Sequence, residues 1–431
     1  MTRFAPAGPL RGSLRPPSDK SISHRAALIA AMGEGETRIV NYLEAADTVS
    51  TLNAIESLGA DARRFELDSG LNYLIEGVGL RGAESSSIDV GNAGTLLRLL
   101  PGWLVGQVGR EWTLDGDDSI RRRPVDRIAE PLRGMGADLS ARDDRLPPLE
   151  IRGAPLRGTT YEMPIASAQV KSCLLFAGLL AEGETRVVEP VPSRDHTERM
   201  LAAAGADVRR DGDAVVIRPA ERLEPDWIVV PADISSAAFF LLAGLLVPGS
   251  EVVLDQVGVN PTRTGILTIL ERMGAEIEVE PRGEHGGEPA ARLTVRSAAL
   301  HGTEVGGAEV PLAIDELPLV ALAACFAEGT TTIRDAAELR RKESDRIATV
   351  SEALNGLGGR VEPTDDGMVI EGTGGLRGGA ISSHGDHRVA MLGAVAGLAS
   401  SEGVEVAGMD AAAVSYPGFE ADLAVLLGSG A

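Results

Sequence analysis

The sequence has few cysteines and no apolar run long enough to cross a membrane. Cys173 and Cys325 both stand in apolar helical segments, so we expect small buried side chains rather than a disulfide or a catalytic thiol. The longest apolar run, Ala237 to Val247, is about half of what a bilayer crossing needs. Residues 1–15 show no charged-then-apolar signal. These absences predict a cytoplasmic protein in a reducing compartment, with no membrane partner.

Positive charge is also scarce, since 41 Lys and Arg face 63 Asp and Glu and the formal net charge is -22. Such a chain repels a phosphate backbone, so we expect no nucleic-acid partner. Small anions need only a local positive cleft. Basic residues cluster at 121–123 and 340–342, although either cluster alone also fits a solvated surface. The six histidines lack a zinc-binding spacing and no ATP phosphate-loop motif occurs, so we expect no metal and no cofactor.

The chain has 431 residues, a length that suggests two or three domains. A short motif with a central glycine, the glycine phrase, recurs along it. Each copy follows an apolar-periodic segment and precedes a short stretch rich in β-formers. A glycine at this point predicts the end of a helix, because glycine adopts the left-handed backbone at little cost. The copies are Leu58-Gly59-Ala60-Asp61, Met135-Gly136-Ala137-Asp138, Ala204-Gly205-Ala206-Asp207, Met273-Gly274-Ala275-Glu276 and Leu357-Gly358-Gly359-Arg360.

A second phrase recurs between these glycines, a polar cap followed by a long apolar helix. The caps are Asp19, Asn92, Ser167, Asp233, Asp315 and Asp386, and the steps between them are 73, 75, 66, 82 and 71 residues. The spacing indicates six copies of an α/β unit of about 70 residues. Helix starts of this kind have exposed N–H groups and partial positive charge, which favour anions.

Cationic side chains stand beside these caps, where a structural cap needs only one short polar residue. A cation at a helix start is unfavourable by about 0.3–1 kcal/mol, so its repeated occurrence suggests that an anion binds there. The alternative is a set of six ordinary capped helices. The residues at or one turn into the starts are Lys20, Ser21, His24, Arg25, Thr95, Arg98, Gln169, Lys171, Asp315, His387 and Arg388.

Seven motifs in order resemble those of the EPSP synthases, which belong to the enolpyruvyl transferase family. The resemblance covers nearly the whole chain. The motifs are residues 18–25 (SDKSISHR), 91–98 (GNAGTLLR), 121–124 (RRRP), 166–172 (ASAQVKS), 193–197 (SRDHT), 340–346 (RRKESDR) and 385–388 (GDHR).

The resemblance implies an α/β fold of two domains, an inside-out α/β barrel. It has six repeats of a βαβαββ-type unit, three per domain, with helices inside and sheets outside. We expect domain one to comprise residues 1–18 and 232–431 and domain two residues 19–231. The chain would cross between them near Leu14–Asp19 and Trp227–Asp233, with the active site in the interdomain cleft. We expect a monomer.

The resemblance also implies the substrates, shikimate 3-phosphate and phosphoenolpyruvate, and their ligands. The residues that would bind shikimate 3-phosphate are Lys20, Ser21, Arg25, Ser167, Ala168, Gln169, Arg194, Asp315 and Lys342. Those that would bind phosphoenolpyruvate are Lys20, Asn92, Gly94, Arg123, Gln169, Arg346 and Arg388. Ala168 stands where the family often has a second serine, and the lysine that many relatives carry near the C-terminus is absent from residues 413–417.

The implied reaction transfers the enolpyruvyl group to the 5-hydroxyl of shikimate 3-phosphate by addition and elimination, a step towards chorismate and the aromatic amino acids. It needs a base near the hydroxyl and an acid near the methylene carbon. Asp315 is the candidate base, although an aspartate there could also be a helix cap. Glu343 and Lys20 are the candidates for moving the methylene proton, and His387 could orient these groups. The sequence leaves the division of proton steps among Asp315, Glu343 and Lys20 open.

Two other functions fit parts of the pattern. The related transferase that acts on UDP-N-acetylglucosamine shares the donor, but it uses a loop cysteine, and both cysteines here stand in apolar helices. A non-catalytic repeat scaffold is also conceivable, but the ordered charges at the caps disfavour it. The resemblance further implies inhibition by glyphosate at the phosphoenolpyruvate site, with Gly94 forming the close wall.

Overall fold

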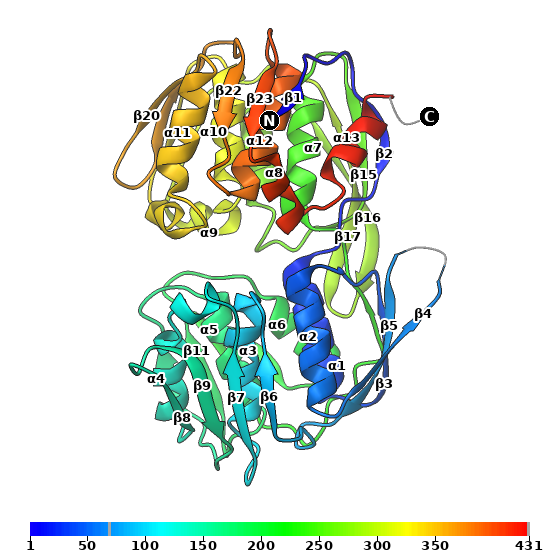
Figure 1. Ribbon diagram of the computed structural model, residues 1–431, viewed down its shortest axis with the longest axis vertical. Coiled ribbons are helices and arrows are strands. Elements are labelled where there is room, and N and C mark those ends of the chain that lie inside the picture. The colour runs from blue at the N-terminus through cyan, green and yellow to red at the C-terminus, as the bar shows by residue number, and fades with distance from the viewer. Residues whose placement is uncertain (68–69, 429–431) are drawn as a thin grey trace. The chain divides into compact units, whose positions relative to one another are not determined.

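The computed structural model describes residues 1–67 and 70–428, which form a mixed α/β protein with two compact units. Unit 1 comprises Met1–Pro17, Ala232–Gly283 and Pro289–Ala431, and unit 2 comprises Ser18–Pro231 and Glu284–Glu288. The chain therefore passes from unit 1 to unit 2 after Pro17 and returns after Pro231. Figure 1 shows helices and strands alternating along both units. Among the described residues, no helix is both long and apolar enough to span a membrane.

Unit 2 contains three four-stranded sheets with one common strand order. In each sheet the first two strands are parallel and the remaining pairs are antiparallel. The three sheets are β14 (Trp227–Val229)-β3 (Glu34–Val40)-β5 (Asn72–Val78)-β4 (Asp61–Phe65), β6 (Ser86–Asp89)-β7 (Glu111–Asp115)-β9 (Leu146–Arg152)-β8 (Asp138–Arg142) and β10 (Thr160–Glu162)-β11 (Thr185–Val188)-β13 (Ala214–Ile217)-β12 (Val208–Asp211). Because β14 pairs with β3, the last strand of this unit completes the sheet begun by its first.

Unit 1 has two four-stranded sheets and one of three strands. In the first four-stranded sheet, β2 from the N-terminal segment runs parallel to β15, so the chain start is held by a strand more than 230 residues later. The sheets are β2 (Arg11–Leu14)-β15 (Glu251–Gly258)-β17 (Glu288–Arg296)-β16 (Ile277–His285), β18 (Glu304–Val305)-β19 (Thr330–Ile333)-β21 (Met368–Glu371)-β20 (Arg360–Pro363) and β22 (Gly379–Ser382)-β23 (Val404–Ala407)-β1 (Thr2–Phe4).

Long helices with almost every residue buried form the centre of each hydrophobic core. Their many small residues permit close packing; a Cβ on Gly102 would lie 2.1 Å from the carbonyl oxygen of Cys173 on the neighbouring helix. Both cysteines are buried and unpaired, which confirms the sequence prediction. These helices are α1 (Lys20–Met32), α3 (Gly94–Leu104) and α5 (Ala168–Gly178) in unit 2 and α7 (Ile234–Leu246), α10 (Leu317–Phe326) and α12 (His387–Ala399) in unit 1.

Most of the other helices end at the recurring glycine phrase. The glycines after α2, α4, α6, α8 and α11 have φ between +91° and +105°, as the sequence predicted. The remaining helices, α9 and α13, belong to unit 1. The bounds are α2 (Ala46–Ser57), α4 (Asp126–Gly134), α6 (His196–Ala203), α8 (Gly265–Arg272), α9 (Val310–Ala313), α11 (Arg346–Gly356) and α13 (Phe419–Leu426).

The predicted caps are confirmed at four of the six central helices. The side chains of Asp19, Ser167, Asp233 and Asp386 accept hydrogen bonds from backbone N–H groups at the starts of α1, α5, α7 and α12. The prediction is wrong for the other two, because α3 begins after Ala93 and α10 after Glu316, without a side-chain cap. The side chains of Asn92 and Asp315 accept hydrogen bonds from Arg123 and Arg346 instead.

Candidate functional site

In unit 2, the first two turns of α1 carry Lys20, Ser21 and Arg25. The Lys20 ammonium lies 3.1 Å from Asp47 Oδ2, and its side chain is about a third exposed, at 35%. Arg25 is buried and bonded on three sides: Nε donates to Thr197 Oγ1 (2.7 Å), Nη2 to Ser172 Oγ (2.9 Å) and Nη1 to the Ser21 carbonyl (2.9 Å). Arg25 therefore joins α1 to α5 and α6 through neutral oxygens.

Burial lowers the pKa of Arg25 to about 10, whereas the Glu198 and Asp19 carboxylates raise it and the Arg194 charge lowers it. The guanidinium stays protonated at neutral pH. Arg194, which contributes to this pKa, lies in the loop before α6. The same helix carries the buried His24, whose Nδ1 lies 2.6 Å from Thr51 Oγ1. Burial, Lys20 and Arg25 lower the pKa of His24 to about 3, so this imidazole is neutral.

The start of α3 lies under the Arg123 guanidinium. A Cβ on Gly94 would be 2.5 Å from Arg123 Nη1, so only glycine admits this side chain without displacement. Asn92 holds the arrangement, since its Oδ1 accepts from Arg123 Nη2 (2.7 Å) and its Nδ2 donates to Asp117 Oδ2 (2.6 Å). Arg121 is exposed and pairs with Asp115 instead.

The start of α5 contacts the start of α3 through Gln169. Its Oε1 accepts from Arg98 Nη1 (3.2 Å) and its Nε2 donates to Thr95 Oγ1 (3.3 Å). Burial lowers the pKa of Arg98 to about 10, with a further contribution from the charges of Arg123 and Arg127. Ser167 caps α5, and the Ala168 carbonyl accepts from the Ser172 hydroxyl (2.6 Å). The expected unit 2 residues therefore gather around the starts of α1, α3 and α5.

In unit 1, Arg346 at the start of α11 contacts three carboxylates. Its Nε donates to Asp386 Oδ2 at 2.8 Å, its Nη2 to Glu343 Oε2 at 2.5 Å and its Nη1 to Asp315 Oδ1 at 3.4 Å. The Arg346 side chain is 1% exposed and Asp386 is fully buried. Both groups must be paired, because an isolated buried charge is costly.

Two further cations gather around Asp315. Lys342 Nζ lies 3.4 Å from Asp315 Oδ1 and 3.4 Å from Glu338 Oε1. Arg388, near the start of α12, donates from Nη1 to the Asp315 carbonyl at 3.0 Å and to Glu316 Oε1 at 3.5 Å. All of the expected unit 1 residues, Asp315, Lys342, Glu343, Arg346, His387 and Arg388, therefore lie in one charged cluster.

The acidic and imidazole groups of this cluster have shifted pKa values. Burial raises the pKa of Asp386 and Glu343, but Arg346 together with backbone N–H groups and the His387 charge outweighs burial, and the net pKa of each lies below its usual value. Burial and the Arg388 charge lower the pKa of His387 to about 4. At neutral pH the cluster thus holds ionised carboxylates and a neutral imidazole.

Comparisons with known proteins agree over the whole chain. The family described as EPSP synthase (3-phosphoshikimate 1-carboxyvinyltransferase) matches residues 4–423. A protein of that enzyme name from Anaeromyxobacter sp. (strain Fw109-5) is 53% identical, covering 98% of each chain. Another from Thermus thermophilus is 48% identical, covering 98% of this chain and 97% of the relative. A solved EPSP synthase from Acinetobacter baumannii superposes with a TM-score of 0.91 at 43% identity, covering 98% of this chain and 97% of that one.

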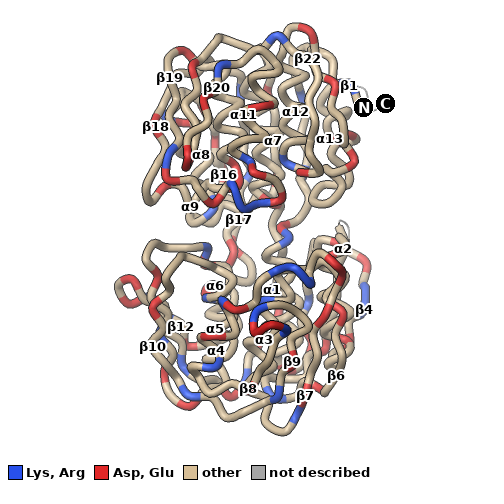
Figure 2. Tube along the Cα trace, turned by 60° about the vertical axis from the view of Figure 1, so that its left-hand side comes forward, with Lys and Arg blue, Asp and Glu red and all other residues tan. Residues whose placement is uncertain are grey.

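The chain belongs to the EPSP synthase family. It is an enzyme of enolpyruvyl transfer in the shikimate pathway, and membership favours this function over UDP-sugar transfer and over a non-catalytic scaffold. Within residues 1–67 and 70–428, no cluster of three His, Cys, Asp or Glu could hold a metal ion. Acidic and basic segments are interspersed over both units, so the charged helix starts are local features of an acidic protein (Figure 2).

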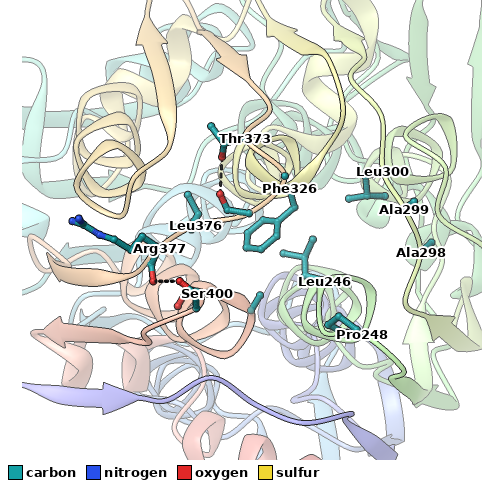
Figure 3. A pocket seen from close by; sticks show the side chains of 14 residues that line it. Leu246, Pro248, Ala298, Ala299, Leu300, Phe326, Thr373, Leu376, Arg377 and Ser400 are labelled. Carbon is teal, nitrogen blue, oxygen red and sulfur yellow. Dashed lines mark hydrogen bonds between the residues drawn. The ribbon is translucent and has the colours of Figure 1, made fainter.

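One hollow of this EPSP synthase family member lies away from these residues. It has a volume of about 560 Å³ in unit 1 and is lined by Leu246, Phe326 and Ala399 near the C-terminal ends of α7, α10 and α12 (Figure 3). The charged cluster stands at the opposite, N-terminal ends of these helices. The hollow contains none of the expected site residues.

Sequence reasoning missed several residues that hold the site together. Asp47 pairs with Lys20, Thr197 and Ser172 bind Arg25, and the buried Glu316 accepts from Arg388 and from the Ser235 hydroxyl. Thr197 and Ser172 lie within the motifs of the resemblance, and Glu316 directly follows Asp315. Only the fold could reveal these partners, because most of them are distant in sequence.

Proposed function

We propose that this chain transfers the enolpyruvyl group of phosphoenolpyruvate to the 5-hydroxyl of shikimate 3-phosphate, releasing phosphate and 5-enolpyruvylshikimate 3-phosphate. One observation carries the proposal: in each unit, arginines converge on the starts of buried helices, Arg25 and Arg123 in unit 2 and Arg346 and Arg388 in unit 1. The two substrates bring two carboxylates and two phosphates, groups that arginine binds through paired N–H donors.

The substrate roles follow the family resemblance and fit the contacts. Shikimate 3-phosphate would bind Lys20, Ser21, Arg25, Ser167, Ala168, Gln169 and Arg194 of unit 2 together with Asp315 and Lys342 of unit 1. Phosphoenolpyruvate would bind Lys20, Asn92, Gly94, Arg123 and Gln169 of unit 2 together with Arg346 and Arg388 of unit 1. Ala168 offers only backbone atoms, so Arg194 supplies the phosphate contact that a second serine makes in other members.

Asp315 is the proposed base for the 5-hydroxyl. Its carboxylate does not cap α10, because the cap position is Glu316, and it contacts the Lys342 and Arg346 cations instead. These contacts support the catalytic role over the capping role. The hydroxyl oxygen bonds to the carbon that carries the departing phosphate, and Asp315 takes its proton.

The methylene carbon must gain a proton in the addition step and lose one in the elimination step. Glu343 is ionised at neutral pH because Arg346 lowers its pKa, which suits proton removal in the elimination. Lys20 is the candidate donor of the methylene proton in the addition, and its ammonium would stabilise the departing phosphate. His387, held neutral by burial, would orient the groups around Glu343.

We also propose how the sheets and helices of the fold are organised into repeats. We interpret the six sheets as six repeats of one βαβαββ-type unit, three in each of the expected domains, with the long buried helices inside and the sheets outside. The shared strand order of the four-stranded sheets supports the repeat. Substrates would bind in a cleft formed by residues of both domains, and the enzyme would act as a monomer.

One assay tests the function. Phosphate release from phosphoenolpyruvate is measured with shikimate 3-phosphate, with UDP-N-acetylglucosamine and with no acceptor. We expect release only with shikimate 3-phosphate. Release with the UDP-sugar would support the related transferase, and no release with either acceptor would support a scaffold.

A further inference from the structure

Lys171, in the first turns of α5, is a fully buried cation that the proposed reaction does not use. Its Nζ lies 3.0 Å from Glu189 Oε2 and 2.7 Å from Glu198 Oε1. The Lys171 and Glu189 side chains are 0% exposed, and Glu198 is 12% exposed. Removing such charges from water is unfavourable, and apolar side chains of similar size often replace them without loss of stability. A buried triad of this kind therefore suggests a role in specifying local geometry.

The loop between β11 and α6 takes its shape from this cluster. Glu189 Oε1 accepts from the Ser193 N–H at 3.0 Å and from the Ser193 hydroxyl, and Lys171 Nζ donates to the Ser193 carbonyl at 3.4 Å. The buried Lys171–Glu189 ion pair thus links the two ends of segment 189–193, because Glu189 is its first residue and both side chains bind Ser193. Pro190 and Pro192 fix two φ angles inside the closed segment.

The next residue along the loop is Arg194, and its charge acts on Arg25. Two cations repel each other, so the position of Arg194 relative to Arg25 has to be imposed by the structure that holds the loop. Glu198 interacts with both the buried ion pair and Arg25: it pairs with Lys171, and its charge raises the pKa of Arg25.

We propose that Lys171, Glu189 and Glu198 are positioning residues that hold the 189–195 loop so that Arg194 and Arg25 together receive an anionic group of the acceptor substrate. This inference rests on the proposed function, in which Arg194 and Arg25 bind shikimate 3-phosphate. It adds a device for acceptor recognition that touches no substrate itself. Phosphoenolpyruvate recognition, which we assign to other residues, should be unaffected.

The test compares Glu189→Gln with Arg210→Met. Arg210 approaches the same carboxylate at 3.5 Å from the exposed side, with 43% of its side chain exposed. Glu189→Gln should raise the KM for shikimate 3-phosphate by about tenfold, the scale of one lost charge-assisted hydrogen bond. The KM for phosphoenolpyruvate and kcat should stay within about twofold, because the donor site is untouched. Arg210→Met should leave all three constants unchanged.

A double-mutant cycle with Arg194→Ala shows whether Glu189 acts through Arg194. In the Arg194→Ala background, Glu189→Gln should add no further increase in the KM for shikimate 3-phosphate. Additive effects, equal rises in both KM values, or a lowered melting temperature with unchanged KM values would overturn the inference. If Arg194→Ala raises the KM but Glu189→Gln does not, the inference fails and the proposed function stands; a wild-type chain without turnover overturns the proposed function.

A triple variant without the three charges keeps the test valid if a single substitution prevents folding. Lys171→Met removes the buried cation from both carboxylates and leaves Glu189 with Arg210 alone, at 3.5 Å, so it is expected to destabilise unit 2. Lys171→Met/Glu189→Gln/Glu198→Gln removes all three charges together and should fold. It should still show the selective rise in the KM for shikimate 3-phosphate, and a folded triple variant with a normal KM would overturn the inference.

Discussion

The arginines at the helix starts of unit 2 and those of unit 1 have different hydrogen-bond partners. In unit 2, Arg25 donates to two hydroxyls and a carbonyl, Arg98 to an amide oxygen and a carbonyl, and Arg123 to an amide oxygen and a hydroxyl. These neutral acceptors orient the guanidinium groups without cancelling their charge.

In unit 1 the cations are bonded to carboxylates. Arg346 contacts Asp386, Glu343 and Asp315, and carboxylates also lie near Lys342 and Arg388. The positive charge is largely neutralised, and the acids are held ionised beside it. The difference fits the proposed function, in which unit 2 attracts the anionic substrates and unit 1 supplies the carboxylate bases Asp315 and Glu343.

Lys20 departs from this comparison, because it is a unit 2 cation with a carboxylate partner, Asp47. We expect Lys20→Met to lower kcat by about a thousandfold, since one side chain would contact both substrates and the departing phosphate. Phosphate release gives the rate. The melting temperature should hardly change, because a partly exposed ion pair contributes little stability. A variant that keeps most of its activity would remove Lys20 from the chemistry and restore a purely binding role to unit 2.

Asp315→Asn tests the catalytic half of the comparison. We expect kcat to fall by about a hundredfold or more, the usual effect of losing a general base, with both KM values nearly unchanged. Glu338→Gln is the matched control, because Glu338 also lies 3.4 Å from Lys342 but is 64% exposed. Its kcat should equal that of the wild type. If Asp315→Asn lowered the melting temperature and spared turnover, Asp315 would be structural and the base would lie elsewhere.

The sequence was sufficient for features that depend on neighbouring residues. The glycine phrase predicted five left-handed helix ends, and four caps are confirmed, because both features involve atoms within one helical turn. The caps at Asn92 and Asp315 were wrong because these side chains pair with arginines instead. The sequence pattern, a short polar residue before an apolar helix, is the same at the four confirmed caps and at Asn92 and Asp315, so it could not separate them.

The charge pairing of the two units could not be predicted in this way. Arg25 and Thr197 are 172 residues apart, and Arg346 and Asp386 are 40 apart. The motifs contain the cations, but whether a cation meets a hydroxyl or a carboxylate depends on which loops the fold brings to the helix start. The segment Glu284–Glu288, which belongs to unit 2 although its hairpin strands lie mostly in unit 1, gave no sequence signal either.

Gly94→Ala sharpens the role of the uncompensated charge in unit 2. The new methyl would meet Arg123 Nη1 at 2.5 Å and must displace the guanidinium from Asn92. We expect glyphosate, which is longer than phosphoenolpyruvate, to lose about tenfold or more in inhibition constant, and the KM for phosphoenolpyruvate to rise less. Competitive inhibition titrations measure both. Equal inhibition constants in the two proteins would mean that Gly94 does not form the wall of the donor site.

A smaller effect concerns the two buried histidines, one in each unit. The pKa falls to about 3 for His24 and about 4 for His387, from an ordinary value of 6.5. Below pH 6.5 the unfolded chain binds a proton at each position that the folded chain does not bind. Stability should therefore decrease as the pH falls from about 6.5 towards these folded-state values. The carboxylates of Asp386 and Glu343 add to the loss only at lower pH, because their ordinary pKa values are 3.8 and 4.5.

Hydrogen exchange, which reports on each unit separately, can follow this loss. His24→Gln should flatten the pH dependence of protection in unit 2 alone by about 1 kcal/mol per pH unit between pH 5 and 6, and His387→Gln should do the same in unit 1 alone. Both variants remove one proton from the difference between folded and unfolded chains, so the two slopes should change equally. An unchanged slope in one unit would show that its histidine is protonated in the folded state. For His387 that result would add a cation to the carboxylate cluster and weaken the contrast between the two units.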